Sequence, residues 1–198
     1  MRSPRTACRG FTLVELMITL TIAAILAFLA VPSLTAYKRN AELTAATNTL
    51  LAAINAARGE AMKRGMNTLV VPTNNGTDWN TGWVVFVDKD AARNQTYDAG
   101  VDEAILVQGA MPTYVTVSGT GIADNTSPSP YIKFDASGYA RSRSGGSGNL
   151  TLSLTRTDLA GAQLAEQTRR IKIANTGRTR TCKPASATDS SCSGTVND

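Results

Sequence analysis

The sequence predicts an α+β fold in which one long N-terminal helix packs against a C-terminal antiparallel β-sheet domain. Residues 11–31 form an apolar run that a single charge, Glu15, interrupts. Apolar residues then recur at spacings of mostly three and four up to residue 61, which is typical of an amphipathic helix. Beyond Gly65 the period changes to two, and clusters of Gly, Pro, Asn and Ser separate short apolar segments, as in a β domain.

The run over residues 11–31 is long enough to cross a membrane. As a helix that rises ~1.5 Å per residue, it would be about 31 Å long. A secretory signal peptide has a shorter apolar core and a small-residue cleavage site, whereas here Pro32 follows the run without an Ala-x-Ala site. A plain membrane anchor explains the length, but it does not explain Glu15, because a carboxylate inside an anchor is costly and usually marks function.

The helix should continue beyond the apolar run. Pro32 is expected to bend it without ending it, because helical signals resume at once. The apolar stripe that follows consists of Ala41, Leu43, Ala46, Leu50, Ile54, Ala57 and Ala61. Lys63 and Arg64 followed by Gly65 are typical of a helix C-terminus. We therefore predict one helix from about residue 12 to 64, whose second half, within residues 32–65, is amphipathic and packs against the globular domain.

The remainder of the chain, residues 66–198, reads as an antiparallel β domain without a further amphipathic helix. Trp83 and Phe86, in the strongest strand, are expected to pack the sheet onto the helix. The predicted strands cover residues 68–71, 83–87, 104–108, 114–118, 131–134, 149–155, 169–174 and 178–181.

The composition argues against an enzyme or a metal protein. The 198 residues include no His, which removes His-based triads, general bases and metal sites together. The acidic segment over residues 88–103 could suggest calcium, but Ala92 and Arg93 occupy EF-hand positions that need an oxygen ligand and a Gly. A solvated hairpin loop is the favoured interpretation, and no cofactor is expected.

The start of the chain carries a motif of high specificity, Arg9-Gly10-Phe11-Thr12-Leu13-Val14-Glu15-Leu16. It resembles the class III leader of type IV pilins and type II secretion pseudopilins. The resemblance implies that residues 1–10 are a leader, that a prepilin peptidase cuts between Gly10 and Phe11, and that Phe11 is then N-methylated. It also implies that Glu15 faces the amine of Phe11 on a neighbouring subunit, where the pair offsets the burial cost of both charges.

Motifs in the β domain narrow the resemblance to the GspH/FimT branch of pilin-like proteins. These motifs are Trp79-x-x-Gly82-Trp83-x-x-Phe86, Ile132-x-Phe134 with Gly138, and Ile171-x-Ile173 running into Thr176-Gly177-Arg178. The resemblance implies a minor subunit held in the inner membrane by a single helix, with residues 66–198 in the periplasm. Its partners would be other pilins or pseudopilins of a type IV pilus or a type II secretion system.

Two cysteines remain once the leader, which contains Cys8, is removed. An even pair in a domain that faces an oxidising compartment predicts a disulfide between Cys182 and Cys192. The bridge would close a short loop and stabilise the domain by roughly 2–3 kcal/mol.

Positive charge gathers at the C-terminal end, where residues 141–198 carry nine bases and four acids. Gly177-Arg178-Thr179-Arg180 resembles the Gly-Arg-x-Arg element of FimT-type minor pilins that bind DNA during natural transformation. Side chains two apart in a strand point the same way, so a basic surface for sequence-independent binding of double-stranded DNA is one hypothesis. The other is a structural subunit that primes or caps the filament without DNA. The candidate DNA-binding residues are Arg178, Arg180, Gly177, Arg170, Lys172, Arg141 and Arg143.

Overall fold

A computed structural model describes residues 10–90, 94–122 and 130–195 of the chain. The leader residues 1–9 and the loop residues Ala92 and Arg93 therefore lie outside the described residues. The chain divides into two compact units, one up to Ala41 and the other from Glu42 onward.

A single helix, α1 (Leu13–Arg64), runs through both units, and the prediction of one helix over about 12–64 is confirmed. Thr12 caps its start, because the backbone N–H of Glu15 donates to the Thr12 hydroxyl at 3.2 Å. The helix continues through Pro32 without a break. It ends at Gly65, whose φ of +67° a side chain would disfavour, and whose N–H donates to the carbonyl of Ala61 at 2.9 Å.

The first half of α1 is apolar and open to its surroundings. It contains a stretch long and apolar enough to cross a membrane, and none of that stretch is buried inside the structure. Leu13 is 74% exposed and Phe28 is 81% exposed. These side chains therefore contribute nothing to the core of the β domain.

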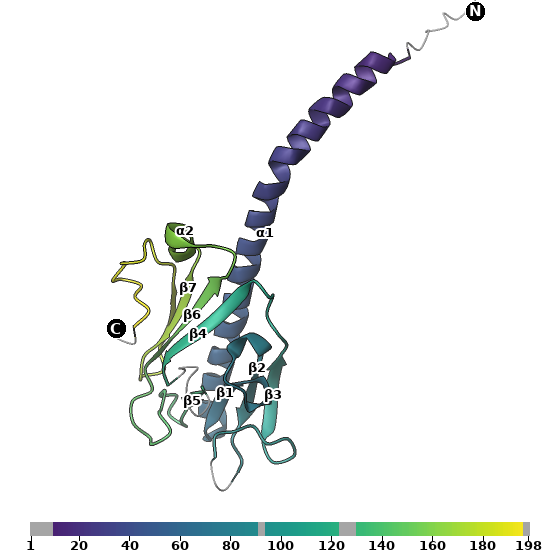
Figure 1. Cartoon of the computed structure of the whole chain (residues 1–198). Coiled ribbons are helices and arrows are strands. Elements are labelled where there is room, and N and C mark those ends of the chain that lie inside the picture. Colours follow the sequence, from purple (N-terminus) through teal and green to yellow (C-terminus); the bar gives the residue numbers. More distant parts are fainter. Residues whose placement is uncertain (1–9, 91–93, 123–129, 196–198) are drawn as a thin grey trace, which may run out of the picture. The chain divides into compact units, whose positions relative to one another are not determined.

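The second unit holds two antiparallel sheets beside the C-terminal part of α1 (Figure 1). The first has the order β3-β2-β1-β5, with β1 (Thr68–Pro72), β2 (Trp83–Val87), β3 (Glu103–Gln108) and β5 (Ile132–Phe134). The second has the order β4-β6-β7-β8, with β4 (Val115–Gly121), β6 (Leu150–Arg156), β7 (Arg169–Ile173) and β8 (Thr179–Cys182). Short 3-10 turns, η1 (Thr73–Asn75) and η2 (Trp79–Thr81), join β1 to β2.

All of the predicted strands form, with ends shifted by a residue or a few. A second helix, α2 (Gly161–Glu166), was not predicted. It has six residues and none of them is buried, so it has no apolar stripe that a periodicity argument could detect.

One core joins the helix to both sheets. Ala53, Ala57 and Ala61 are completely buried, and their small side chains let the strands come close to the helix backbone. Larger apolar side chains fill the space between the helix and the two sheets, and burial of each stabilises the fold by about 1.5–3 kcal/mol. They include Leu43, Leu50 and Ile54 of α1, Val70, Trp83, Val85, Ile132 and Phe134 of the first sheet, and Val115, Val117, Leu150, Leu152, Leu154, Ile171 and Ile173 of the second.

The prediction that Trp83 and Phe86 both pack against the helix is half right. Trp83 belongs to the cluster that includes α1, but Phe86 belongs to a separate cluster on the other face of the first sheet. There its ring lies 5.4 Å from that of Tyr97. Side chains alternate along a strand, so two residues three positions apart lie on opposite faces.

Arg58 ties α1 to both sheets. Its Nε donates to the carbonyl of Gly138, which follows β5, at 3.0 Å. Its Nη2 donates to the carbonyl of Thr176, in the turn between β7 and β8, at 3.3 Å. The two turns also contact each other directly, because the N–H of Ala140 donates to the carbonyl of Asn175 at 2.9 Å.

This junction predicts that Gly177 tolerates no side chain. Its φ is +76°, and a Cβ there would lie 1.9 Å from the Gly138 carbonyl oxygen and 2.7 Å from Arg58 Nε. We expect Gly177→Ala to lower the free energy of unfolding by about 3 kcal/mol or more, since both backbone strain and overlap contribute. Urea unfolding of a soluble fragment that starts near residue 36 measures this loss.

Gly145 provides the matched control. Its φ is +85°, but a Cβ there would meet no atom within 4 Å. Gly145→Ala should therefore cost only about 1–2 kcal/mol, the penalty of the left-handed backbone alone. Equal losses for the two variants would show that Gly177 is not constrained by the junction.

Candidate functional sites

The predicted leader cleavage point lies just before α1. Gly10 and Phe11 are outside any regular element, and Phe11 is 78% exposed. A peptidase needs an accessible peptide bond outside regular structure, and Gly10 and Phe11 are exposed and outside any helix or strand.

Glu15 has a local contact that the sequence reasoning missed. Thr12 and Glu15 have the Thr-x-x-Glu spacing of a capping box, and the bond from the Glu15 N–H to the Thr12 hydroxyl is one half of it. A carboxylate in the first turn also interacts favourably with the partial positive charge of a helix N-terminus. Helix capping is thus an intramolecular role for Glu15. A test of an intersubunit role must distinguish the two roles.

The turn between β7 and β8 presents the arginines of the Gly-Arg-x-Arg element. The N–H of Gly177 donates to the carbonyl of Ala174 at 2.9 Å, and the N–H of Ala174 donates to the carbonyl of Arg178 at 3.0 Å. Arg178 is exposed and Arg180 is half-buried. Both line one shallow cavity of about 350 Å³, together with Ala174 and Thr176. The role of Gly177 itself lies in the backbone of the turn, since it carries no side chain and is buried.

Neither Arg170 nor Lys172 of β7 is open to solvent. Lys172 is 2% exposed. Arg170 is half-buried, and its Nη1 donates to the carbonyl of Cys192. Burial lowers the pKa of the Arg170 guanidinium, and the Asp189 carboxylate opposes that shift. Alternation along β7 places both side chains opposite the core, as predicted, and the C-terminal segment binds Arg170 there.

This C-terminal segment, residues 183–195, is here called the strap. The predicted disulfide between Cys182 and Cys192 is present, with a Cα–Cα distance of 5.8 Å, and it ties Cys192, near the end of the strap, back to the last residue of β8. Side chains of the second sheet hold its end. Arg170 donates to the carbonyl of Cys192, Thr120 Oγ1 donates to that of Gly194 at 3.1 Å, and Thr151 Oγ1 donates to that of Thr195 at 3.0 Å.

Asp189 organises the turn inside the strap. Its carboxylate accepts hydrogen bonds from the N–H of Ala185 at 2.9 Å and from the N–H of Ser191 at 2.9 Å. The Ser191 hydroxyl donates to it as well, at 2.6 Å. These bonds, chiefly that from Ala185, lower the pKa of Asp189 to about 2. The carboxylate therefore stays charged at neutral pH and keeps the turn closed.

Arg141 and Arg143, in the loop after β5, contact side chains at the two ends of β5. Arg141 Nε lies 2.6 Å from a carboxylate oxygen of Asp135, and its guanidinium lies 5.1 Å from the centre of the Tyr139 ring. The guanidinium of Arg143 lies 4.7 Å from the centre of the Tyr131 ring. Burial would raise the pKa of Asp135, but the bonds from Arg141 and two backbone N–H groups lower it overall.

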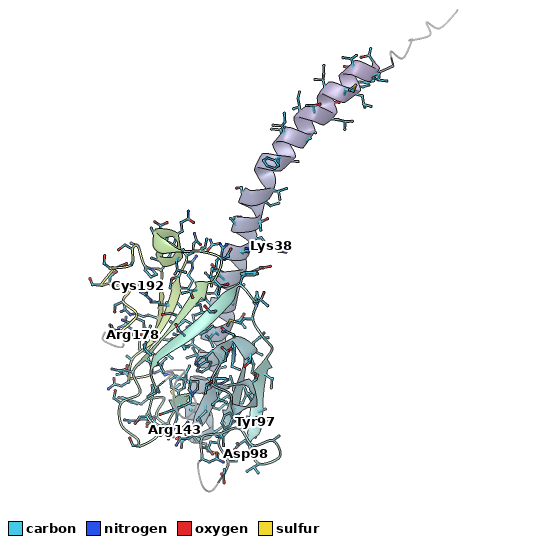
Figure 2. The ribbon with its side chains drawn as sticks, viewed as in Figure 1. Lys38, Tyr97, Asp98, Arg143, Arg178 and Cys192 are labelled. Atoms are coloured by element: carbon cyan, nitrogen blue, oxygen red, sulfur yellow. A yellow bond between two sulfur atoms is a disulfide. The ribbon has the colours of Figure 1, made fainter. Side chains whose placement is uncertain are left out.

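Figure 2 shows the separation of these basic groups. Arg178 and Cys192 lie along the left margin of the domain, and Arg143 lies near its lower end. Of the candidate basic side chains, Arg178 is exposed, whereas Arg180, Arg170, Arg141 and Arg143 are half-buried and Lys172 is buried.

The acidic loop over residues 88–103 is held by backbone bonds. Asp102 accepts from the N–H of Lys89 and from the N–H of Asp98, each at 2.9 Å. Burial raises the pKa of Asp88, and the like charge of Asp102 adds to that shift. In the described part of the chain, no group of three or more carboxylate or cysteine side chains is placed to hold a metal ion.

Comparisons with known proteins agree with this architecture. The family model of type II transport protein GspH matches residues 46–177, and that of the prokaryotic N-terminal methylation motif matches residues 5–31. No curated protein sequence matches the chain.

Two solved structures of the type IV minor pilin FimU from Pseudomonas aeruginosa strain PAO1, in different crystal forms, are similar to it. Each is 15% identical with a TM-score of 0.50. One alignment covers 75% of this chain and 98% of that pilin, and the other covers 70% and 91%. At this identity the likeness concerns the fold.

Proposed function

This chain belongs to the GspH family and is a minor pilin-like subunit of a type IV pilus or a type II secretion system, and we propose that it enters the filament through the first half of α1. The observation that carries the proposal is that the two halves of α1 have different surroundings. Residues beyond Glu42 complete the core of the β domain, whereas the apolar side chains of the first half are exposed. Before assembly, the inner membrane covers that apolar surface, with the β domain in the periplasm. Within a filament, other subunits cover it.

Glu15 is proposed to set the position of the subunit in the filament. Cleavage after Gly10 creates a positive amine on Phe11, or a methylated amine that is still positive. Both that amine and Glu15 would be surrounded by apolar side chains in a filament, where an unpaired charge is costly. A pair between Glu15 of one subunit and Phe11 of the next removes this cost only at one axial position, so it fixes the register.

We predict that Glu15→Val leaves membrane insertion intact but lowers incorporation into filaments roughly tenfold or more, because removing one partner of a buried pair typically costs about 3–5 kcal/mol. Immunoblots of sheared filaments and of membrane fractions measure the two quantities.

Glu15→Gln separates pairing from capping. Gln keeps the capping-box chemistry but carries no charge. If Glu15 pairs with the neighbouring amine, Gln should fail as Val does. Normal incorporation of the Gln variant would show that helix capping is the whole role of Glu15.

DNA binding is a second candidate function, and the cavity that Arg178 and Arg180 share favours it. A guanidinium can bridge two phosphate oxygens. Arg178, just before β8, and Arg180, within β8, line the same cavity and so offer adjacent contacts to a phosphate backbone. Such contacts carry no base information, so binding would be independent of sequence. This candidate corresponds to a FimT-type subunit for natural transformation. If the subunit does not bind DNA, its role is to prime or cap a pilus or pseudopilus.

We predict that Arg178→Gln/Arg180→Gln reduces duplex binding and lowers the slope of log affinity against log salt by about 1.8, since each lost phosphate contact removes about 0.9. Fluorescence anisotropy with labelled duplex over a range of salt concentrations measures both quantities.

The matched control is Arg141→Gln/Arg143→Gln, which removes the same net charge from arginines that contact side chains at the two ends of β5. This variant should bind nearly as the wild type does. Equal losses for the two double variants would show that net charge, and not the turn between β7 and β8, governs binding. No salt-dependent binding by the wild type would leave the structural role alone.

A further inference from the structure

The outer face of the second sheet carries a row of polar and basic side chains. Thr120 lies opposite Thr151, Thr151 opposite Lys172, and Lys172 opposite Arg180. Directly opposite residues point to the same face of a sheet, so these four side chains share the face that the core does not use. Arg170 pairs with Cys182 two residues along and lies on the same face.

This face would be strongly positive if it were open. Arg170 and Lys172 stand about 7 Å apart along β7, and the neighbouring strand with Arg180 is about 4.8 Å away. Arg178, just before β8, adjoins this group through the cavity that it shares with Arg180. Together the four side chains would form one strip of positive charge. A polyanion such as the phosphate backbone of DNA is electrostatically complementary to it.

The strap hides half of this strip and contributes little apolar packing of its own. Residues 183–195 contain no large apolar side chain, and most of them are exposed. The strap has no regular secondary structure. Apart from the bridge between Cys182 and Cys192, hydrogen bonds from Arg170, Thr120 and Thr151 attach it to the second sheet. Lys172, opposite Thr151 on the same face of the sheet, is buried. A cover of this kind is held in place by its bridge and its hydrogen bonds, not by a core.

We propose that the strap is an autoinhibitory cover over a phosphate-binding surface. Where the strap is displaced, Arg170 and Lys172 join Arg178 and Arg180, and the site for duplex DNA grows from two cations to four. This proposal rests on the DNA-binding candidate function described above and adds to it an element that controls when two of the candidate residues, Arg170 and Lys172, are available.

The test releases the strap in the full-length protein, purified in a nonionic detergent, with Cys182→Ser/Cys192→Ser. Acetylation of Lys172 by a water-soluble N-hydroxysuccinimide ester, followed by peptide mass spectrometry, reports its exposure. Lys63, whose side chain is 73% exposed, is the internal reference. Lys172 should react slowly in the wild type and several-fold faster in the variant.

The second readout is duplex affinity as a function of salt. Two additional contacts should steepen the slope of log affinity against log salt by about 1.8 in the released variant. Adding Lys172→Gln to that variant should remove about half of this gain, because one contact accounts for about 0.9. Exposure of Lys172 without any change in affinity or slope would overturn the proposal.

A second variant covers the case in which loss of the bridge unfolds the domain. Thr120→Val/Thr151→Val removes the two hydroxyls that bind the end of the strap and keeps both side-chain shape and disulfide. In this variant Lys172 should be acetylated faster, and the slope of log affinity against log salt should become steeper. If Lys172 becomes exposed and the slope does not change, the proposal is overturned. Salt-dependent binding only after release would place the site under the strap and count against Arg178 and Arg180 as a sufficient site. Absence of binding in every form would reject both ideas.

Discussion

The bonds from Arg58 to the carbonyls of Gly138 and Thr176 are the interaction on which the arrangement of the β domain depends. The two sheets do not share a strand, so they meet through α1, through this junction, and where the N–H of Val117 in β4 donates to Asn80 Oδ1 in η2 at 2.7 Å. Gly177 has to be a glycine because the turn passes so close to Gly138 and to Arg58. The same junction holds the Gly-Arg-x-Arg turn firmly on the helix. The contacts that require a glycine at position 177 therefore also hold the neighbouring Arg178 in its exposed position.

Most of the fold could be predicted from the sequence because its periodic signals are strong. The stripe of α1 and the alternating strands depend on burial of one face, and burial leaves a pattern in the sequence. The helix α2 is too short to leave such a pattern. The placement of Phe86 was wrong for a different reason. Its motif with Trp83 suggested a shared role, whereas the alternation of β2 separates the two side chains.

The candidate sites were predicted less completely, because tertiary contacts decide which charges are available. Nothing in the local sequence of β7 indicates that Arg170 will bind the carbonyl of Cys192, over twenty positions away. The strap has no periodicity, so its path could not be foreseen from composition. Glu15 is the opposite case. Its capping-box partner Thr12 lies three residues before it, so the Thr-x-x-Glu spacing could have predicted this contact from the sequence alone. The family motif, which contains both residues, directed the interpretation of Glu15 to contacts between subunits.

The central claim is that this chain becomes a filament subunit whose mature helix begins at Phe11. Intact-mass and N-terminal peptide mass spectrometry of the protein, isolated from cells that express a matching prepilin peptidase, tests it most directly. We predict loss of residues 1–10 and a single methyl group on the amine of Phe11. An intact leader, or cleavage on the far side of the apolar run after Ala30, would contradict it.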